Sequence, residues 1–255
     1  MNELDSDIPR KVPRNFNSVK FIPNFLTLFA LCVGLTALRF GIAGKWSEAA
    51  IFIMIAAILD GLDGYVARAL DASSIFGAQL DSFADFISFG VAPALIIYLW
   101  GLENGGPFGW FATLIFCVAV ALRLARFNTK DLQRSKDLTT AFFEGVPAPA
   151  GAILAMIPIF LSNQFMQGRS NDIPTIYIEI WMFFIAGLMV SKLPTYSLKN
   201  INLNMGLKQR LTLGASSIVF CIALAFAPWT TIIISSFLYL IALVHCSRNF
   251  KKRTS

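Results

Sequence analysis

Long apolar segments separated by short polar turns dominate the chain. A helix crosses the bilayer core, about 30 Å thick, with about 20 apolar residues. On that basis we expect eight membrane-spanning helices at roughly 22–43, 47–69, 80–100, 108–127, 146–163, 176–192, 210–227 and 230–247. Gly44-Lys45 makes a very short turn between the first two, whereas Pro147, Pro149 and Pro158 weaken the fifth. The pattern therefore predicts an all-α integral membrane protein.

The same pattern predicts one transmembrane domain over residues 21–248. Before it comes a polar segment, residues 1–20, with no apolar stretch ending in a small-residue cleavage site, so we do not expect a signal peptide. After it comes a short basic tail, residues 249–255.

Composition agrees with a membrane protein, since 56% of the 255 residues are hydrophobic and only 14% are charged. Soluble domains carry about 25% charged residues. The net charge of +6 could suggest nucleic acid, but the basic residues gather at helix ends instead. Eighteen of the 21 Lys and Arg residues fall on one side of the predicted membrane, leaving Arg39, Lys45 and Arg169 on the other. The positive-inside rule then puts both termini in the cytoplasm, with the protein in the inner membrane.

Four carboxylates interrupt the apolar pattern within LDGLDGYVARALDASSIFGAQLDSFADFISFG, residues 59–90. Asp60 and Asp63 lie near the cytoplasmic end of the second predicted helix, three residues apart and so on one face. Asp81 and Asp85 open the third, four residues apart and also on one face. Because a short loop joins these helices, we expect the two pairs to face each other at one depth.

Converging carboxylates repel one another, and a low dielectric makes their ionisation costlier still. Two divalent cations would offset the four charges, and all-oxygen ligation selects Mg²⁺ or Mn²⁺. Two such ions could clamp a pyrophosphate. An ion pathway in a transporter is the alternative, but Gly64, Ala67 and Gly77 leave room beside the acids for a bulky ligand.

The residues Asp60 to Asp85 follow the pattern D-x2-D-G-x2-A-R-x8-G-x3-D-x3-D. This pattern resembles the signature of the CDP-alcohol phosphotransferases, membrane enzymes that displace CMP from a CDP-linked lipid or alcohol. Further segments are similar to the phosphatidylserine synthase branch: PNFLTL, SFGVAPALIIY, ALRLARFN, FFEGVPAPA and LMVSKLPTYSLK. The resemblance implies a helical catalytic core, a homodimer, and transfer of a phosphatidyl group from CDP-diacylglycerol to L-serine.

The resemblance also implies roles for individual residues. Asp60, Asp63 and Asp81 would bind one metal ion, and Asp60, Asp81 and Asp85 a second, with Asp85 also the general base. The residues expected around the CDP-lipid are Asn24, Thr27, Gly64, Ala67, Arg68, Ser74 and Gly77.

The acceptor alcohol is specified less directly. Arg123 and Arg126 lie three apart and could bind the carboxylate of serine, while Glu144 could receive its ammonium group and Asn128 could assist. Sister enzymes that use choline, glycerol 3-phosphate or inositol phosphate remain alternatives.

Overall fold

The computed structural model describes residues 21–72, 74–133, 143–166, 173–191, 194–195, 220 and 222–254, which are almost entirely helical. Two short strands, β1 (Phe143–Glu144) and β2 (Pro194–Thr195), pair antiparallel. The polar segment 1–20 and most of the predicted seventh helix, 210–227, lie outside the described residues.

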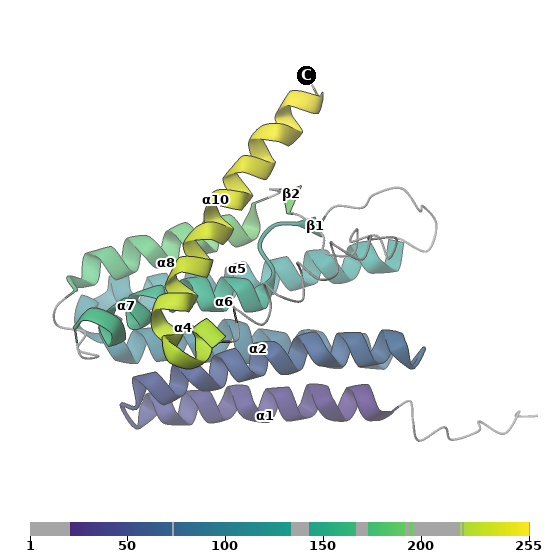
Figure 1. Ribbon diagram of the computed structural model, residues 1–255, viewed down its shortest axis with the longest axis horizontal. Coiled ribbons are helices and arrows are strands. Elements are labelled where there is room, and N and C mark those ends of the chain that lie inside the picture. The colour runs from purple at the N-terminus through teal and green to yellow at the C-terminus, as the bar shows by residue number, and fades with distance from the viewer. Residues whose placement is uncertain are drawn as a thin grey trace, which may run out of the picture.

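Helices α1 (Ile22–Ile42) and α2 (Trp46–Ala69) form an antiparallel hairpin whose bounds confirm the first two predicted spans. They lie side by side (Figure 1). Small residues let α1 approach the helical segment 86–97: a Cβ at Gly34 would lie 2.7 Å from Cβ of Ser88, and one at Gly41 would lie 2.8 Å from Cγ1 of Ile96. Close backbone approach at small residues is the usual way that membrane helices pack.

The third and fourth predicted spans form one helical run with a sharp reversal. It comprises α3 (Ile75–Asp85), the π-helix η2 (Phe86–Val91), α4 (Ala92–Ile97), the π-helix η3 (Tyr98–Leu102), the 3₁₀ turn η4 (Glu103–Gly105) and α5 (Gly106–Gln133). The chain reverses at Gly106, whose φ of 60° suits glycine. The reversal returns α5 along η2, α4 and η3, so residues late in α5 lie beside α3.

The remaining helices complete the bundle. The predicted fifth span is broken into α6 (Ala148–Ala155) and α7 (Ile157–Phe165), which meet at 41°. Pro158 sits in the first turn of α7, where its missing N–H costs no hydrogen bond. Then come α8 (Thr175–Val190) and α10 (Pro228–Thr254). Helix α10 crosses the bundle obliquely and its C-terminal end extends beyond the other helices (Figure 1).

Within the described part of the chain, four helical stretches are long and apolar enough to span a membrane, or five if the bent pair α6–α7 is one span. The run Ile75–Thr129 counts once among them although it doubles back, and α8, at 16 residues, is short for a span. The all-helical membrane fold is therefore confirmed, whereas the count of eight spans is not and stays a prediction. Large apolar side chains such as Phe25 and Phe108, 72% and 70% exposed, lie on the outer surface, where lipid would cover them.

Candidate metal centre and substrate pocket

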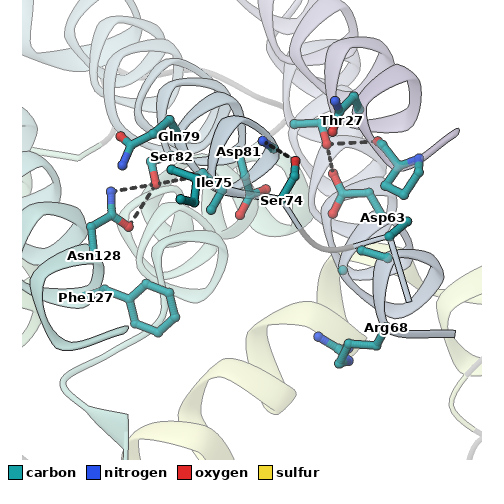
Figure 2. Close-up of a pocket in the computed structure, with 17 residues that line it drawn as sticks. Thr27, Asp63, Arg68, Ser74, Ile75, Gln79, Asp81, Ser82, Phe127 and Asn128 are labelled. Atoms are coloured by element: carbon teal, nitrogen blue, oxygen red, sulfur yellow. Dashed lines mark hydrogen bonds between the residues drawn. The ribbon is translucent and has the colours of Figure 1, made fainter. Parts of the chain in front are cut away.

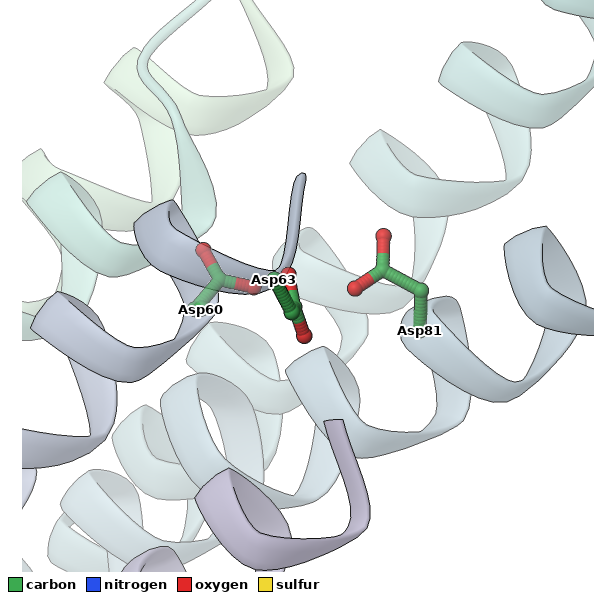
Figure 3. A group of neighbouring side chains, drawn as sticks. All are labelled: Asp60, Asp63 and Asp81. Carbon is green, nitrogen blue, oxygen red and sulfur yellow. The ribbon is translucent and has the colours of Figure 1, made fainter. Parts of the chain in front are cut away.

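Three carboxylates meet where α2 ends and α3 begins. Asp60, Asp63 and Asp81 each offer an oxygen atom, and these oxygens lie within 4.8 Å of one another (Figure 3). The intervening turn makes this possible: Asp71 has a φ of 47°, and the Ser74 hydroxyl accepts a hydrogen bond from the Gly77 amide, capping α3. The predicted convergence of the two helices is thus confirmed for these three acids.

Asp63 is the most deeply placed of the three, with only 4% of its surface exposed. The hydroxyl of Thr27, on α1, lies 2.7 Å from Asp63 Oδ2 and 3.0 Å from the Pro23 carbonyl oxygen (Figure 2). Its single proton can satisfy either acceptor. Helix α1 thereby fixes the orientation of a carboxylate that α2 supplies, as ligand-supporting side chains commonly do.

Asp85 lies one helical turn beyond Asp81 and contacts a different member of the group. Its carboxyl group is in hydrogen-bonding contact with that of Asp60. Arg123, from the returning helix α5, interacts electrostatically with both of these acids. The four predicted carboxylates therefore form one connected set, with the guanidinium at the Asp85 end.

A pocket of about 580 Å³ opens beside the carboxylates. The residues predicted to surround a CDP-lipid all line it: Asn24, Thr27, Gly64, Ala67, Arg68, Ser74 and Gly77. The Arg68 guanidinium points into the open space (Figure 2). Gly77 packs against Asn24, because a Cβ there would lie 2.9 Å from Oδ1 of Asn24 and would displace that side chain.

Other lining residues were not singled out from the sequence, among them Gln79, Ser82 and Phe127. Ser82 and Asn128 hydrogen-bond each other, with Ser82 Oγ 3.1 Å from Asn128 Oδ1 and 3.0 Å from Asn128 Nδ2. Residues on α3 and α5 can be paired this way only once the reversal at Gly106 is known. The i, i+3 spacing of Gln79 and Ser82 carries no chemical signal by itself.

The four residues predicted to bind serine do not share one location. Asn128 lines the pocket, whereas Arg123 faces Asp60 and Asp85. Arg126 donates a hydrogen bond to the Val190 carbonyl oxygen at 2.9 Å, which ties α5 to the end of α8. The backbone of Glu144 belongs to β1, but its side chain lies outside the described part of the chain.

Comparison with known proteins points to one family. The family model described as CDP-alcohol phosphatidyltransferase matches residues 20–193. A protein of Mycobacterium leprae named CDP-diacylglycerol–serine O-phosphatidyltransferase is 36% identical, over 89% of this chain and 75% of its own length. Proteins of the same name from Mycobacterium bovis and Helicobacter pylori are 40% and 32% identical, over 69% and 75% of this chain and 61% and 78% of their own lengths. The chain thus spans about three fifths to about three quarters of the length of these relatives.

The hydrogen bond between α1 and Asp63 generates a first prediction. Replacing Thr27 by Val keeps the shape of the side chain but leaves the buried carboxylate without its donor. We expect Thr27→Val to weaken Mn²⁺ binding about tenfold, measured by the electron paramagnetic resonance signal of free Mn²⁺. Thr36→Val is the matched control, because the Thr36 hydroxyl bonds only the Cys32 carbonyl oxygen on the same helix. Equal Mn²⁺ affinity in Thr27→Val and Thr36→Val would contradict the supporting role of Thr27.

Proposed function

The chain belongs to the CDP-alcohol phosphatidyltransferase family, and we propose that it transfers the phosphatidyl group of CDP-diacylglycerol to the hydroxyl of L-serine, giving phosphatidylserine and CMP. One observation carries the proposal: two members of the three-carboxylate cluster, Asp63 and Asp81, line a pocket that all seven residues predicted to contact a CDP-lipid also line. The names of the relatives support serine as the acceptor. A transporter, the alternative from another class, receives no support from these matches.

The donor atoms fit hard divalent cations. Asp60, Asp63 and Asp81 supply oxygen ligands only, and Asp85 lies against Asp60, so the set can serve two ions. We assign them as Mg²⁺ or Mn²⁺, which oxygen ligands suit. When bound, such ions neutralise charge on the phosphate oxygens of the substrate and on the departing CMP.

The pocket residues would hold the nucleotide side of the substrate. Arg68 is free to pair with a phosphate group, and the small residues Gly64 and Ala67 let that group approach the backbone of α2. Ile75 lines the same pocket and is 78% exposed, as is Phe76 at 69%. These side chains would lead the acyl chains from the pocket into the bilayer.

Asp85 would act as the general base. The serine oxygen attacks the phosphorus that carries diacylglycerol, its proton passes to the Asp85 carboxylate, and the bond from that phosphorus to the oxygen of CMP breaks. A positioned base contributes typically 10²–10⁴-fold to such a step. Arg123 lies beside Asp85 and would receive the carboxylate of serine, with Asn128, also on α5, as a further contact. Arg126, bonded to the Val190 carbonyl oxygen, would act by holding α5 against α8.

The placement of charge supports an active site on the cytoplasmic face of the inner membrane. Arg68, Arg123 and Arg126 lie toward the pocket end of the bundle, whereas Arg39 and Lys45 lie at the other end of α1 and α2. Basic residues concentrate on the cytoplasmic side of membrane proteins. Soluble serine and CMP would then exchange with the cytoplasm. We also propose that the protein forms a homodimer.

The function is tested with purified protein in liposomes that contain CDP-diacylglycerol and Mg²⁺ or Mn²⁺. We expect CMP release with L-serine and little with choline, glycerol 3-phosphate or inositol phosphate, and we expect chelation of the metal to stop it. CMP release that depends on one of the other acceptors, and not on serine, would refute the serine assignment while leaving the phosphotransferase class intact.

Asp85→Asn tests the assignment of the base. The amide cannot accept the serine proton, so we expect kcat to fall at least a hundredfold while the dissociation constant for CDP-diacylglycerol changes little. Asp71→Asn is the control, since Asp71 is exposed in the turn between α2 and α3. Near-normal turnover by Asp85→Asn would remove this residue as the base.

Two glycines on α2 offer a matched test of the pocket. Gly64 lines it, whereas no atom of the described residues lies within 4 Å of the position of a Cβ on Gly61. We expect Gly64→Val to raise the KM for CDP-diacylglycerol about tenfold by filling the space for the phosphate, and Gly61→Val to leave it unchanged. Similar KM values for the two variants would show that the nucleotide binds elsewhere.

A further inference from the structure

Two buried polar atoms, one on α5 and one on α10, have no hydrogen-bond partner among the described residues. They are Nε of Arg123 on α5 and the hydroxyl oxygen of Tyr239 on α10. Buried polar groups are nearly always paired, because an unpaired one has lost its hydrogen bonds to water without replacement. Neither residue lines the pocket described above, but two unpaired groups on the Arg123 side of the carboxylates indicate a ligand that completes them.

The two groups are within electrostatic range of each other. Arg123 interacts in the same way with Asp60 and Asp85. Arg123 thus links the acid cluster and Tyr239 in this set of interactions. Tyr239 belongs to α10, which crosses the bundle obliquely (Figure 1).

We propose that Tyr239 is a specificity-determining residue, whose hydroxyl and the Arg123 guanidinium together bind the carboxylate of the acceptor amino acid. The inference rests on the proposed function and adds a residue to it. Tyr239 lies outside the segment that matches the family model, residues 20–193, so membership of the family does not assign it a role.

The chemistry of serine fits this arrangement. Its hydroxyl must reach Asp85 to lose a proton, and its carboxylate lies only a short way from that hydroxyl, so the carboxylate falls beside Arg123. Charge-assisted hydrogen bonds from a guanidinium are strong and directional, and a phenol hydroxyl adds a second, independent donor. An alcohol without a carboxylate would leave both donors buried and unpaired, which is an effective way to reject it.

The test measures steady-state kinetics of Tyr239→Phe in liposomes with L-serine and CDP-diacylglycerol varied separately. Loss of one donor to a buried carboxylate should raise the KM for serine roughly ten- to a hundredfold. We expect kcat and the KM for CDP-diacylglycerol to stay within about twofold of the wild type. Tyr98→Phe is the matched control: Tyr98 packs edge-on against Trp110, with ring centroids 5.1 Å apart, near the far end of α4 and α5.

The outcomes separate the inference from the function on which it rests. An unchanged KM for serine in Tyr239→Phe, or an equal rise for both substrates, overturns the role of Tyr239. A rise of the same size in Tyr98→Phe also overturns it, because the effect would then be structural. The proposed function fails separately, when the wild-type protein releases no CMP with serine.

Discussion

The need to keep several carboxylates charged inside a membrane bundle governs this end of the molecule. An ion in a low-dielectric medium is stable only when opposite charge or hydrogen-bond donors surround it. Thr27 supplies a donor to Asp63 from α1, and Arg123 supplies positive charge to Asp60 and Asp85 from α5. Among the described residues these partners do not balance all four acids. The proposed divalent cations would supply the remaining counter-charge.

Small residues recur where α1 packs against the surrounding helices. Thr27 on α1 reaches Asp63 on α2, and α1 also packs against α3 and η2. Gly34 allows that approach because a Cβ there would collide with Ser88, and Gly77 leaves room for the Asn24 side chain. The glycines near the site therefore have two different roles. Gly34 and Gly77 allow helices to pack closely, whereas Gly64 leaves space for a ligand.

Much of this could be predicted from sequence because it depends on local spacing. Helix length and apolarity set the bounds of α1 and α2, and the i, i+3 and i, i+4 spacing of the acids sets their faces. Features that depend on tertiary packing could not be predicted. The break at Met156 separates α6 from α7, and the π-helical turns η2 and η3 lie along α5. Residue spacing in the sequence reveals neither feature.

Tyr239 is the clearest case of a residue whose role could not be predicted from the sequence. Nothing in its neighbours along α10 distinguishes it from an aromatic residue at a lipid surface, and only the oblique path of α10 brings it toward Arg123. There is a chemical reason for the acceptor contacts to lie apart from the carboxylate motif in the sequence. The donor half of the reaction needs fixed geometry between metal ligands, which a compact motif on two adjacent helices provides. The acceptor differs among CDP-alcohol phosphotransferases, so its contacts can come from separate helices and can change without disturbing the carboxylates.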